Sequence, residues 1–361
     1  MIIGIEAERA NLERKTGVEH YAKQLIQHLA GIDHENQYIL YLRSKPQDWF
    51  LRLPSNFRLK VMPFPIFWTQ LRLSWEMLVH PPDVLLIPAS AMPFIHPKKS
   101  LATIHDLAWK YYPETFNAST RWFLDWSTGF AARRAKTVIA VSEATKKDLV
   151  KFYGVPPDKV KVVHHGFDPA VLEDTAAKLP EGLPDDYVLY LSTLQPRKNP
   201  QGLIDAFAEM KKADPGLKTK LVLVGKLGWK YGEILEKIKN NSEFVVYLNH
   251  IPDEQKNAVL KKARLMVLPS FYEGFGMTIL EAFAAGIPVA TGNLSSMPEV
   301  AGGAAEYFNP QSSESIKNAM LKVLNDSGRA RELVSAGRAR LSQFSWEKCA
   351  KETLSLISEK L

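Results

Sequence analysis

The second half of the chain alternates short apolar runs with amphipathic segments, and this alternation most restricts the possible fold. Apolar runs rich in β-branched residues predict buried strands, and apolar residues at helical spacing predict helices between them. The expected strands are residues 187–193, 220–225, 244–248, 265–270 and 288–291. The expected helices are residues 199–212 with Asn199 as N-cap, 231–240, 253–263 with Asp253 as N-cap, and one beginning at about Met277. Such an alternation predicts a parallel, doubly wound sheet.

The first half repeats the pattern less regularly. Strands are expected at residues 1–5, 38–42, 84–87, 101–104 and 137–141, and helices at 17–30, 120–134 and 142–153. At 361 residues the chain is long enough for two cores. We therefore expect an α/β protein of two facing Rossmann-like parallel-sheet domains with a cleft between them. The expected domains are residues 1–170 and 171–345, linked near 173–186, and we expect 346–361 to form a helix.

Composition excludes several classes of protein. The only cysteine, Cys349, rules out a disulfide framework and a thiolate metal cluster. The N-terminal segment lacks the long apolar core of a signal peptide, and the best membrane-span candidate, "VLLIPASAMPFI", is short and contains two prolines. The expected location is therefore the cytoplasm.

The net charge is +7, and most of this basic excess lies in residues 1–170. Such an asymmetry suggests that the first half meets an anionic partner, either a phospholipid surface or a phosphorylated acceptor. A basic surface without a specific partner explains the charge equally well.

Residues with unusual chemistry gather where the expected strands end. In chain order they are Gly17, His105, Asp106, Arg197, Lys198 and Glu273. Ligands of open α/β sheets bind beyond the carboxyl ends of the strands. We therefore expect these residues to line a single cleft between the two domains.

The segment "FYEGFGMTILE" combines a phosphate-binding pattern with two carboxylates. Gly274 and Gly276 allow close approach of the backbone, and the amides of residues 275–278 (Phe275, Gly276, Met277 and Thr278) point out of a helix start, where anions bind. The third glycine of a dinucleotide fingerprint is absent, and "GKLGWK" lacks the spacing of a P-loop. Arg197 and Lys198 would add charge-assisted contacts to the same phosphates, so a diphosphate is the expected ligand.

Two glutamates beside a phosphate site require a further explanation. Glu273 and Glu281 flank the glycine-containing turn, and carboxylates accept hydrogen bonds from sugar hydroxyls. A ligand that carries both a diphosphate and hydroxyl groups is a nucleotide-sugar. For Glu281 the alternative is a solvated helix carboxylate.

Three segments, "STLQPRKNPQGLIDAF", "LPSFYEGFGMTILEAFAAGIPVATGNLSSMPEVAGGAA" and "VSEATKKDL", together resemble the family 4 glycosyltransferases, retaining enzymes of the GT-B fold. The resemblance runs over most of the chain and is strongest from about residue 187 to 310. It also implies that the C-terminal helix at residues 346–361 returns to the first domain. Its specific signal is the pair of glutamates in the "EGFG...LE" frame; each other motif alone is weak.

The resemblance implies a role for each matching residue. Glu273 contacts the transferred sugar, Glu281 holds the ribose, and Lys198 binds the diphosphate. Arg197 substitutes for a family arginine where this chain has Thr193. Gly17 matches a glycine that approaches the donor phosphate, and His105 matches a histidine near the sugar. The alternative for His105 is a strand cap or a core hydrogen bond.

The resemblance also implies chemistry without a cofactor. There is no Asp-x-Asp sequence, no metal ligand is assigned, and lysine and arginine take the place of a cation. His164 and His165 lack a third ligand at suitable spacing and favour a structural role. The expected mechanism is front-face attack, in which the departing diphosphate helps to deprotonate the acceptor. The "TLQPRKN" loop resembles mannosyltransferase-like members, so mannose from GDP-mannose is the first guess for the donor.

No motif specifies the acceptor. We expect a glycan, a lipid-linked acceptor or a small molecule. Aromatic and basic residues interleave in the first domain and suit a lipid-linked glycan at an anionic membrane surface, on the inner face of the membrane. They are Trp109, Tyr111, Tyr112, Trp122, Trp126, Arg133, Arg134, Lys136, Lys146, Lys147 and Lys151. A core of aromatics with solvated lysines is the alternative. Two competing functions remain open: a nucleotide-sugar epimerase on the same fold, and a non-catalytic basic adaptor for membranes or nucleic acid. No nucleic-acid-binding signature supports the adaptor, and nucleic acid is not an expected partner.

Overall fold

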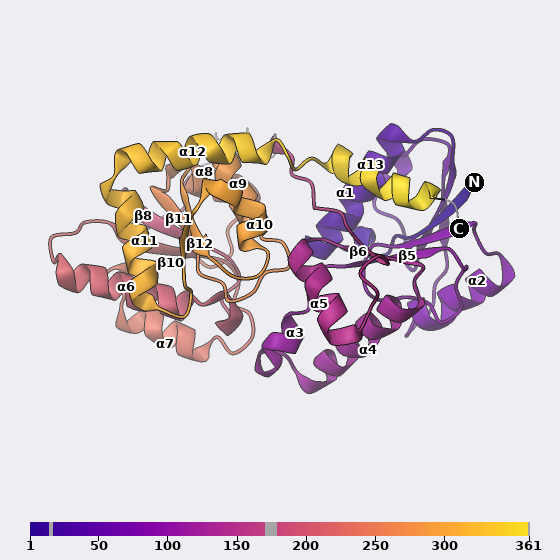
Figure 1. Cartoon of the computed structure of the whole chain (residues 1–361), viewed down its shortest axis with the longest axis horizontal. Coiled ribbons are helices and arrows are strands. Elements are labelled where there is room, and N and C mark those ends of the chain that lie inside the picture. Colours follow the sequence, from indigo (N-terminus) through magenta and orange to yellow (C-terminus); the bar gives the residue numbers. More distant parts are fainter. Residues whose placement is uncertain (14–16, 170–178, 360–361) are drawn as a thin grey trace. The chain divides into compact units, whose positions relative to one another are not determined.

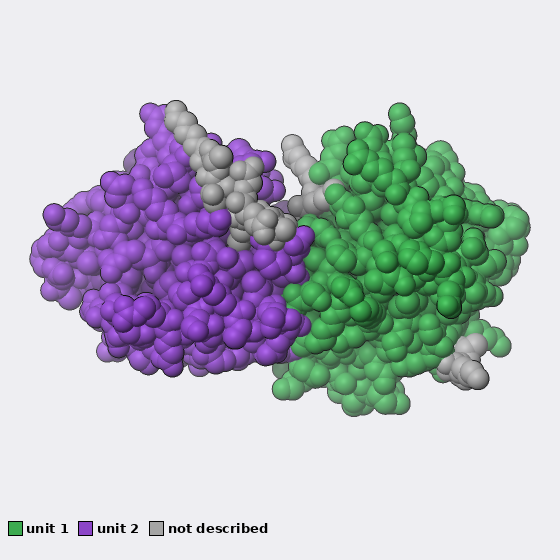
Figure 2. Space-filling view, turned by 90° about the horizontal axis from the view of Figure 1, so that it is seen from above, with its two compact units in different colours: residues 1–111, 117–166, 344–361 green, residues 112–116, 167–343 purple. Residues whose placement is uncertain are grey.

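A computed structural model describes residues 1–13, 17–169 and 179–359. The chain forms two compact units, coloured separately in Figure 2. Unit 1 comprises residues 1–111, 117–166 and 344–361, and unit 2 comprises residues 112–116 and 167–343. Of the predicted linker, residues 173–178 lie outside the described residues.

Unit 1 is built on a parallel sheet with the strand order β3-β2-β1-β4-β5-β6-β7. Figure 1 labels β5 and β6 of this sheet. Its strands are β1 (Ile2–Glu6), β2 (Gln37–Leu42), β3 (Phe57–Val61), β4 (Val84–Ile87), β5 (Ser100–Ile104), β6 (Thr137–Ala140) and β7 (Val160–Val162). Its helices are α1 (Gly17–Ile32), α2 (Ser74–Val79), α3 (Ala108–Tyr111), α4 (Ala118–Arg134), α5 (Glu143–Tyr153) and α13 (Trp346–Ser358). The order reverses direction between β1 and β4, so the loops after these strands meet at a topological switch point.

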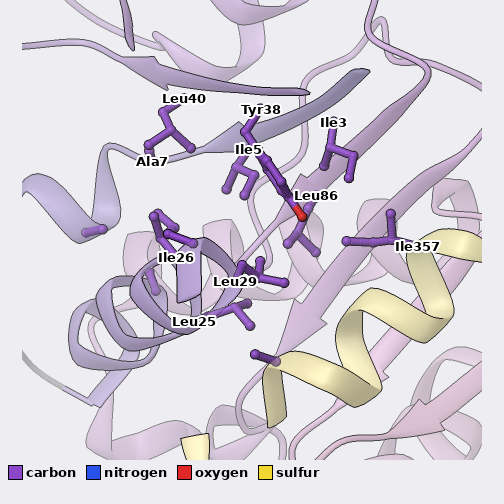
Figure 3. Packing of buried hydrophobic residues seen from close by; sticks show 14 of the residues in the cluster. Ile3, Ile5, Ala7, Leu25, Ile26, Leu29, Tyr38, Leu40, Leu86 and Ile357 are labelled. Atoms are coloured by element: carbon purple, nitrogen blue, oxygen red, sulfur yellow. The ribbon is translucent and has the colours of Figure 1, made fainter. Parts of the chain in front are cut away.

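The last helix belongs to the core of unit 1. Helix α13 packs beside α1, and Ile357 joins Leu25 and Leu29 in one buried cluster (Figure 3). Gly166 lies against the start of this helix, and a Cβ added at Gly166 would lie 2.1 Å from the backbone nitrogen of Trp346. Only glycine permits this approach, which fixes residues 164–166 against the start of α13.

Unit 2 is built on a second parallel sheet with the order β10-β9-β8-β11-β12-β13. Its strands are β8 (Tyr187–Leu191), β9 (Lys220–Val224), β10 (Val245–Tyr247), β11 (Leu265–Leu268), β12 (Val289–Gly292) and β13 (Glu306–Phe308). Its helices are α6 (Pro200–Ala213), α7 (Gly232–Asn240), α8 (Asp253–Lys262), α9 (Met277–Ala285), α10 (Met297–Ala301), α11 (Ser313–Asn325) and α12 (Ser327–Leu341). The predicted parallel α/β sheets are therefore confirmed in both units.

Two predicted helix caps have different outcomes. Asn199 is the N-cap of α6, and its side chain accepts a hydrogen bond from the amide of Gly202, as predicted. The prediction that Asp253 caps α8 is wrong, because Pro252 takes the extended N-cap conformation and Asp253 is the first helical residue. Asp253 therefore contributes a negative charge to the first turn, where it stabilises the helix dipole.

Candidate functional site

The central strands of unit 2 bring two loops of distant sequence together. Strands β8 and β11 are neighbours, and the order reverses between them. The loop after β8 contains a short 3-10 helix, Pro196–Lys198, and the loop after β11 leads to α9. The amide of Phe271 donates to the carbonyl of Arg197 at 3.0 Å, so the two loops are joined through their backbones.

Glu273 is the electrostatic centre of this site. Its carboxylate oxygens both lie 2.5 Å from Lys198 Nζ, and Ser270 Oγ donates to Oε1 at 2.6 Å. Arg197 adds a second positive charge, with Nη1 3.9 Å from Oε2. Glu273 is only 8% exposed. Burial by itself would raise the pKa of Glu273, but Lys198 and Arg197 outweigh burial and hold this pKa below its usual range.

Backbone constraints hold the two cations in place. Asn199, directly after Lys198, adopts a left-handed conformation with φ 53°, and its side-chain amide donates to the carbonyl of Pro310 at 2.8 Å. Gly202 lies so close that an added Cβ would be 2.6 Å from the Asn199 side chain. Arg197 donates to the carbonyl of Tyr272. The cationic loop is therefore fixed at both ends, which lowers the entropy cost of presenting its charges.

Two serines that the sequence analysis did not single out hold the glycine-containing turn. Ser296 Oγ lies 2.9 Å from the carbonyl oxygens of both Glu273 and Phe275 and is fully buried. Ser295 Oγ donates to the carbonyl of Glu273 and lies 3.4 Å from the Glu273 amide. Both serines stand in "GNLSSMPE", which follows β12, the strand next to β11. Their position after a strand that neighbours β11 could have indicated this role from the sequence.

The turn ends at the predicted helix start. Gly276 has φ 99° and serves as N-cap, and α9 begins at Met277. In this conformation a side chain would be strained, which explains the glycine. The amides of Met277 and Thr278 belong to the first turn, whose N–H groups have no partner within the helix. The chain therefore presents donors of positive potential beside the Lys198–Glu273 pair, although Gly274 and Phe275 themselves are buried.

Glu281, the second predicted carboxylate, lies one helical turn into α9. Its Oε1 is 3.0 Å from Lys256 Nζ on α8. Burial opposes the charge of Lys256, but Glu281 and Asp253 outweigh burial and raise the pKa of Lys256. Glu281 thus has a fixed cation of its own, separate from the pair at Glu273.

Unit 1 holds a cavity of about 210 Å³ at the carboxyl ends of β1, β4 and β5. It is lined by Arg9, Val18, Glu19, Ala89, Ser90, Ile104, His105, Asp106, Trp109, Leu124 and Thr128. Gly17 is the exposed first residue of α1 and lies next to the lining residue Val18 in the chain. The predicted residues of unit 1 therefore converge on one edge of its sheet.

His105 contributes a hydrogen-bond acceptor to this cavity wall. Its Nε2 lies 2.9 Å from the carbonyl of Pro88, so Nε2 carries the proton. Burial lowers the pKa of His105, which keeps the ring neutral and leaves Nδ1 with a lone pair. Among the described residues, neither His105 Nδ1 nor the buried Thr128 Oγ1 has a hydrogen-bond partner. These two atoms are suited to a ligand that carries hydroxyl groups.

The predicted aromatic and basic stretch is not one surface. Trp109 is buried, and Tyr112 belongs to unit 2, where its ring stacks on Phe271 with centroids 5.9 Å apart. Trp122 is exposed. The burial of Trp109 agrees with the alternative of core aromatics, and Tyr112 falls outside the first domain, because the chain passes to unit 2 at residue 112.

His164 and His165 pack against aromatic rings. His165 stacks on Tyr21, with centroids 4.9 Å apart, and His164 contacts Phe344. In the part of the chain that the structure describes, no group of three His, Cys, Asp or Glu residues is placed to hold a metal ion. None of the helices described is long and apolar enough to cross a membrane.

Two family models together match most of the chain. Residues 15–171 match "Glycosyltransferase Family 4", and residues 173–340 match "Glycosyl transferases group 1". The two parallel α/β units, each with loops that meet at a topological switch point, have the architecture of the GT-B class of glycosyltransferases. The chain belongs to the family 4 glycosyltransferases.

Relatives of known name agree with this family. The chain is 28% identical over 268 residues to O-antigen chain mannosyltransferase B of Escherichia coli, covering 71% of this chain and 69% of that protein. It is 28% identical over 279 residues to the serotype-specific mannosyltransferase WbdA of Escherichia coli, covering 73% of this chain but 33% of WbdA.

A solved structure shows the same fold. The structure of Anabaena HepE in complex with UDP-glucose has a TM-score of 0.73 and 20% sequence identity, covering 98% of this chain and 99% of HepE.

Proposed function

We propose that this glycosyltransferase moves a hexose from a nucleotide-diphosphate sugar to a glycan, lipid-linked or small-molecule acceptor, with retention of configuration. The observation that carries the proposal is the buried Glu273 paired with Lys198 beside the first amides of α9. Cations and helix amides suit a diphosphate, and a carboxylate suits sugar hydroxyls. Both kinds of group stand in the loops that follow the neighbouring strands β8 and β11, which supports a ligand that carries both a diphosphate and a sugar.

Each residue takes a role that follows from its chemistry. Lys198, Arg197 and the amides of residues 275–278 bind the diphosphate and stabilise its charge as it leaves. Glu273 accepts hydrogen bonds from the transferred sugar, and Glu281 accepts them from the ribose. In unit 1, His105 Nδ1 accepts a hydrogen bond from a hydroxyl group of the sugar. Gly17 leaves room for the donor phosphate at the start of α1.

The reaction needs no metal or covalent intermediate in this proposal. The bond from the anomeric carbon to the diphosphate oxygen breaks, and a bond from that carbon to the acceptor oxygen forms on the same face. The acceptor proton passes to the departing diphosphate. The protein contributes orientation and a fixed environment for the developing charges.

Mannose from GDP-mannose is the proposed donor. It is supported by the two relatives that are named mannosyltransferases. HepE, by contrast, was solved with UDP-glucose, and a uridine donor is therefore the second candidate.

Thermal shifts with GDP-mannose, GDP, UDP-glucose, ADP-glucose and dTDP-glucose test this choice, because a ligand of the native state raises the melting temperature by mass action. We expect GDP-mannose to give the largest shift and EDTA to change neither binding nor turnover. A response to UDP-glucose alone would overturn the choice of base.

Product analysis then separates transfer from epimerisation. Incubation with the responding donor should release nucleoside diphosphate in proportion to a new glycoside, whose anomeric configuration NMR identifies as that of the donor. An altered nucleotide-sugar without a glycoside would favour the epimerase, and an inverted product would overturn retention.

A further inference from the structure

Unit 2 holds a cavity of about 440 Å³ at the opposite edge of its sheet from Glu273. Its wall combines arginines with small and apolar residues, among them Arg264, Gly286, Pro288, Arg331, Val334 and Arg338. Arg264 directly precedes β11 and Pro288 directly precedes β12, so the cavity lies at the amino ends of these strands. Glu273 belongs to the loop that follows β11 at its carboxyl end. The cavity is therefore separate from the candidate donor site.

Helix α12 brings two arginines to this cavity. Arg331, Val334 and Arg338 follow one another at intervals of three and four residues, so one face of α12 forms the wall. Helix α12 packs against α9, and both are labelled in Figure 1. The packing is close, because a Cβ added at Gly337 would lie 2.6 Å from the ring of Phe283 on α9. The face of α12 that carries the arginines is thus fixed in place.

The charges of the two arginines are not neutralised by the protein. Among the described residues, neither Arg331 nor Arg338 makes a hydrogen bond or an ion pair. The acidic residue of α12, Glu332, pairs instead with Arg329 at 2.7 Å. Arg338 lies beside the end of α9, since a Cβ added at Gly286 would lie 3.1 Å from its Nη2. A helix C-terminus offers only about half of one negative charge, so an excess of positive charge remains.

A third guanidinium borders the cavity from the start of β11. Arg264 Nη1 lies 3.3 Å from both carboxylate oxygens of Asp186, and Nη2 donates to the carbonyl of Leu324 at 3.2 Å. These contacts fix the guanidinium, which lowers the entropy cost of binding a ligand against it. Pro288 and Val334 add apolar surface beside the charged groups.

We propose that this cavity binds a small phosphorylated molecule with a non-aromatic body, of the sugar phosphate class. Guanidinium groups bind phosphate through paired, charge-assisted hydrogen bonds. The volume falls within the range of roughly 300–1,000 Å³ that is typical of small-molecule sites. The described residues that line the cavity include no aromatic ring to stack on a nucleobase. They also include none of the exposed large apolar side chains that anchor a protein partner.

Titration calorimetry with mannose 6-phosphate and inorganic phosphate tests the site. We expect mannose 6-phosphate to bind the wild-type protein more tightly than inorganic phosphate, because Pro288 and Val334 contact its sugar. The double variant Arg331→Ala/Arg338→Ala should lose about tenfold or more of this affinity, since two charged hydrogen-bond donors are removed. The double variant Arg331→Lys/Arg338→Lys should recover only part of it, because lysine keeps the charge but not the paired hydrogen bonds.

A control variant separates this site from general attraction of anions to a basic protein. Lys212→Ala/Lys239→Ala removes the same total charge from exposed positions in the last turns of α6 and α7 and should bind mannose 6-phosphate like the wild type. Titration with GDP measures the candidate donor site. GDP affinity should be equal in the wild type and in Arg331→Ala/Arg338→Ala. Loss of GDP affinity in that variant would overturn the separation of the two sites.

Hydrogen–deuterium exchange locates the site without any substitution. Mannose 6-phosphate should slow amide exchange in residues 284–288 and 327–341 and leave residues 271–278 unchanged. Three results would overturn the proposal: no binding of mannose 6-phosphate to the wild type, an equal loss of affinity in the lysine control, or protection of residues 271–278 in place of α12. Equal affinity for inorganic phosphate would overturn the sugar phosphate as the ligand class.

Discussion

Each unit has a buried glutamate at the carboxyl end of a central strand, and the pKa values of these two glutamates are shifted in opposite directions. Glu273 of unit 2 is 8% exposed and Glu6 of unit 1 is 4% exposed. Lys198 and Arg197 lower the pKa of Glu273 despite its burial. At Glu6 burial dominates over the charge of Arg9, and the pKa rises to about 7. Burial alone therefore does not determine the charge of a carboxyl group; the nearby cations do.

The difference corresponds to the proposed division of labour. The edge of unit 2 keeps fixed charges, which suit a diphosphate and the charge that develops on it. In unit 1, burial lowers the pKa of His105 and favours the neutral form of its ring. Neutral donors and acceptors suit hydroxyl groups. The predictions below test this contrast, beginning with the charged edge.

Glu273→Gln should have the largest effect. The amide keeps the shape and the hydrogen bond with Ser270 but loses the charge that stabilises positive charge at the sugar's reacting carbon. We expect kcat to fall about 10²-fold or more, as for removal of one preorganised electrostatic partner. Nucleoside diphosphate binding should not weaken, because Lys198 no longer has a competing carboxylate.

Steady-state kinetics of this variant at saturating donor, with calorimetric titration of nucleoside diphosphate, provides the measurement. Glu314→Gln, a glutamate in the first turn of α11, is the control. Full turnover by the Glu273→Gln variant would disprove the catalytic role of this carboxylate.

Glu6→Gln tests the neutral carboxyl group of unit 1 through stability. The folded-state pKa of about 7 lies above the usual 4.5, so the protonated carboxyl stabilises the fold below about pH 4.5 and this contribution is lost as pH rises to 7. At pH 8 the loss amounts to about 3 kcal/mol, from 1.36 kcal/mol per pKa unit. Glutamine does not titrate, and the variant should gain stability relative to wild type by about this amount between pH 5 and 8.

Urea unfolding at both pH values measures this change. The exposed Glu13 of the following loop gives the control Glu13→Gln, which should show no such gain. A Glu6→Gln variant whose stability parallels that of wild type would mean that Glu6 is ionised in the fold, and the contrast between the units would disappear.

Lys198→Ala probes the cation of the charged edge. Loss of a charged hydrogen bond should weaken nucleoside diphosphate binding by about 1.5–3 kcal/mol, measured by titration calorimetry. The variant also leaves Glu273 buried without its main partner and should be less stable. Adding Glu273→Gln should restore part of that stability, since the two residues form one pair.

Lys317→Ala, which removes a lysine paired with Glu209 at 2.9 Å, is the control. Unchanged diphosphate affinity in Lys198→Ala would show that the phosphates bind elsewhere.

The sequence predicted those features that depend on neighbouring residues. The strand and helix alternation, the Asn199 cap and the start of α9 at Met277 follow from local patterns. Strands β3, β7 and β13 lie at sheet edges. The sequence analysis missed them, because β7 and β13 have three residues each and β3 has charged residues in a run of five.

Features that depend on tertiary packing were not predictable. Lys198 and Glu273 are 75 positions apart, and motif reading assigned one to phosphate and the other to sugar without their direct contact. The exposure of Phe67 and Trp75 was not predictable either. Phenylalanine and tryptophan in "FPIFWTQLRLSW" have the composition of a core, and only the folded chain reveals which side faces water.

Glu281→Gln should have the smallest effect and sharpens the comparison within unit 2. Its carboxylate pairs with Lys256 and, in the proposed role, holds the ribose, which is bound alike in the ground state and the transition state. We therefore expect donor affinity to fall by about 1 kcal/mol, the usual net value of a hydrogen bond, with kcat within about twofold of wild type. Kinetics at saturating and limiting donor separate the two parameters, and Lys256→Met shows whether the ion pair alone is responsible. If Glu281→Gln lowers kcat more than Glu273→Gln does, the assignment of sugar and ribose to the two glutamates is reversed.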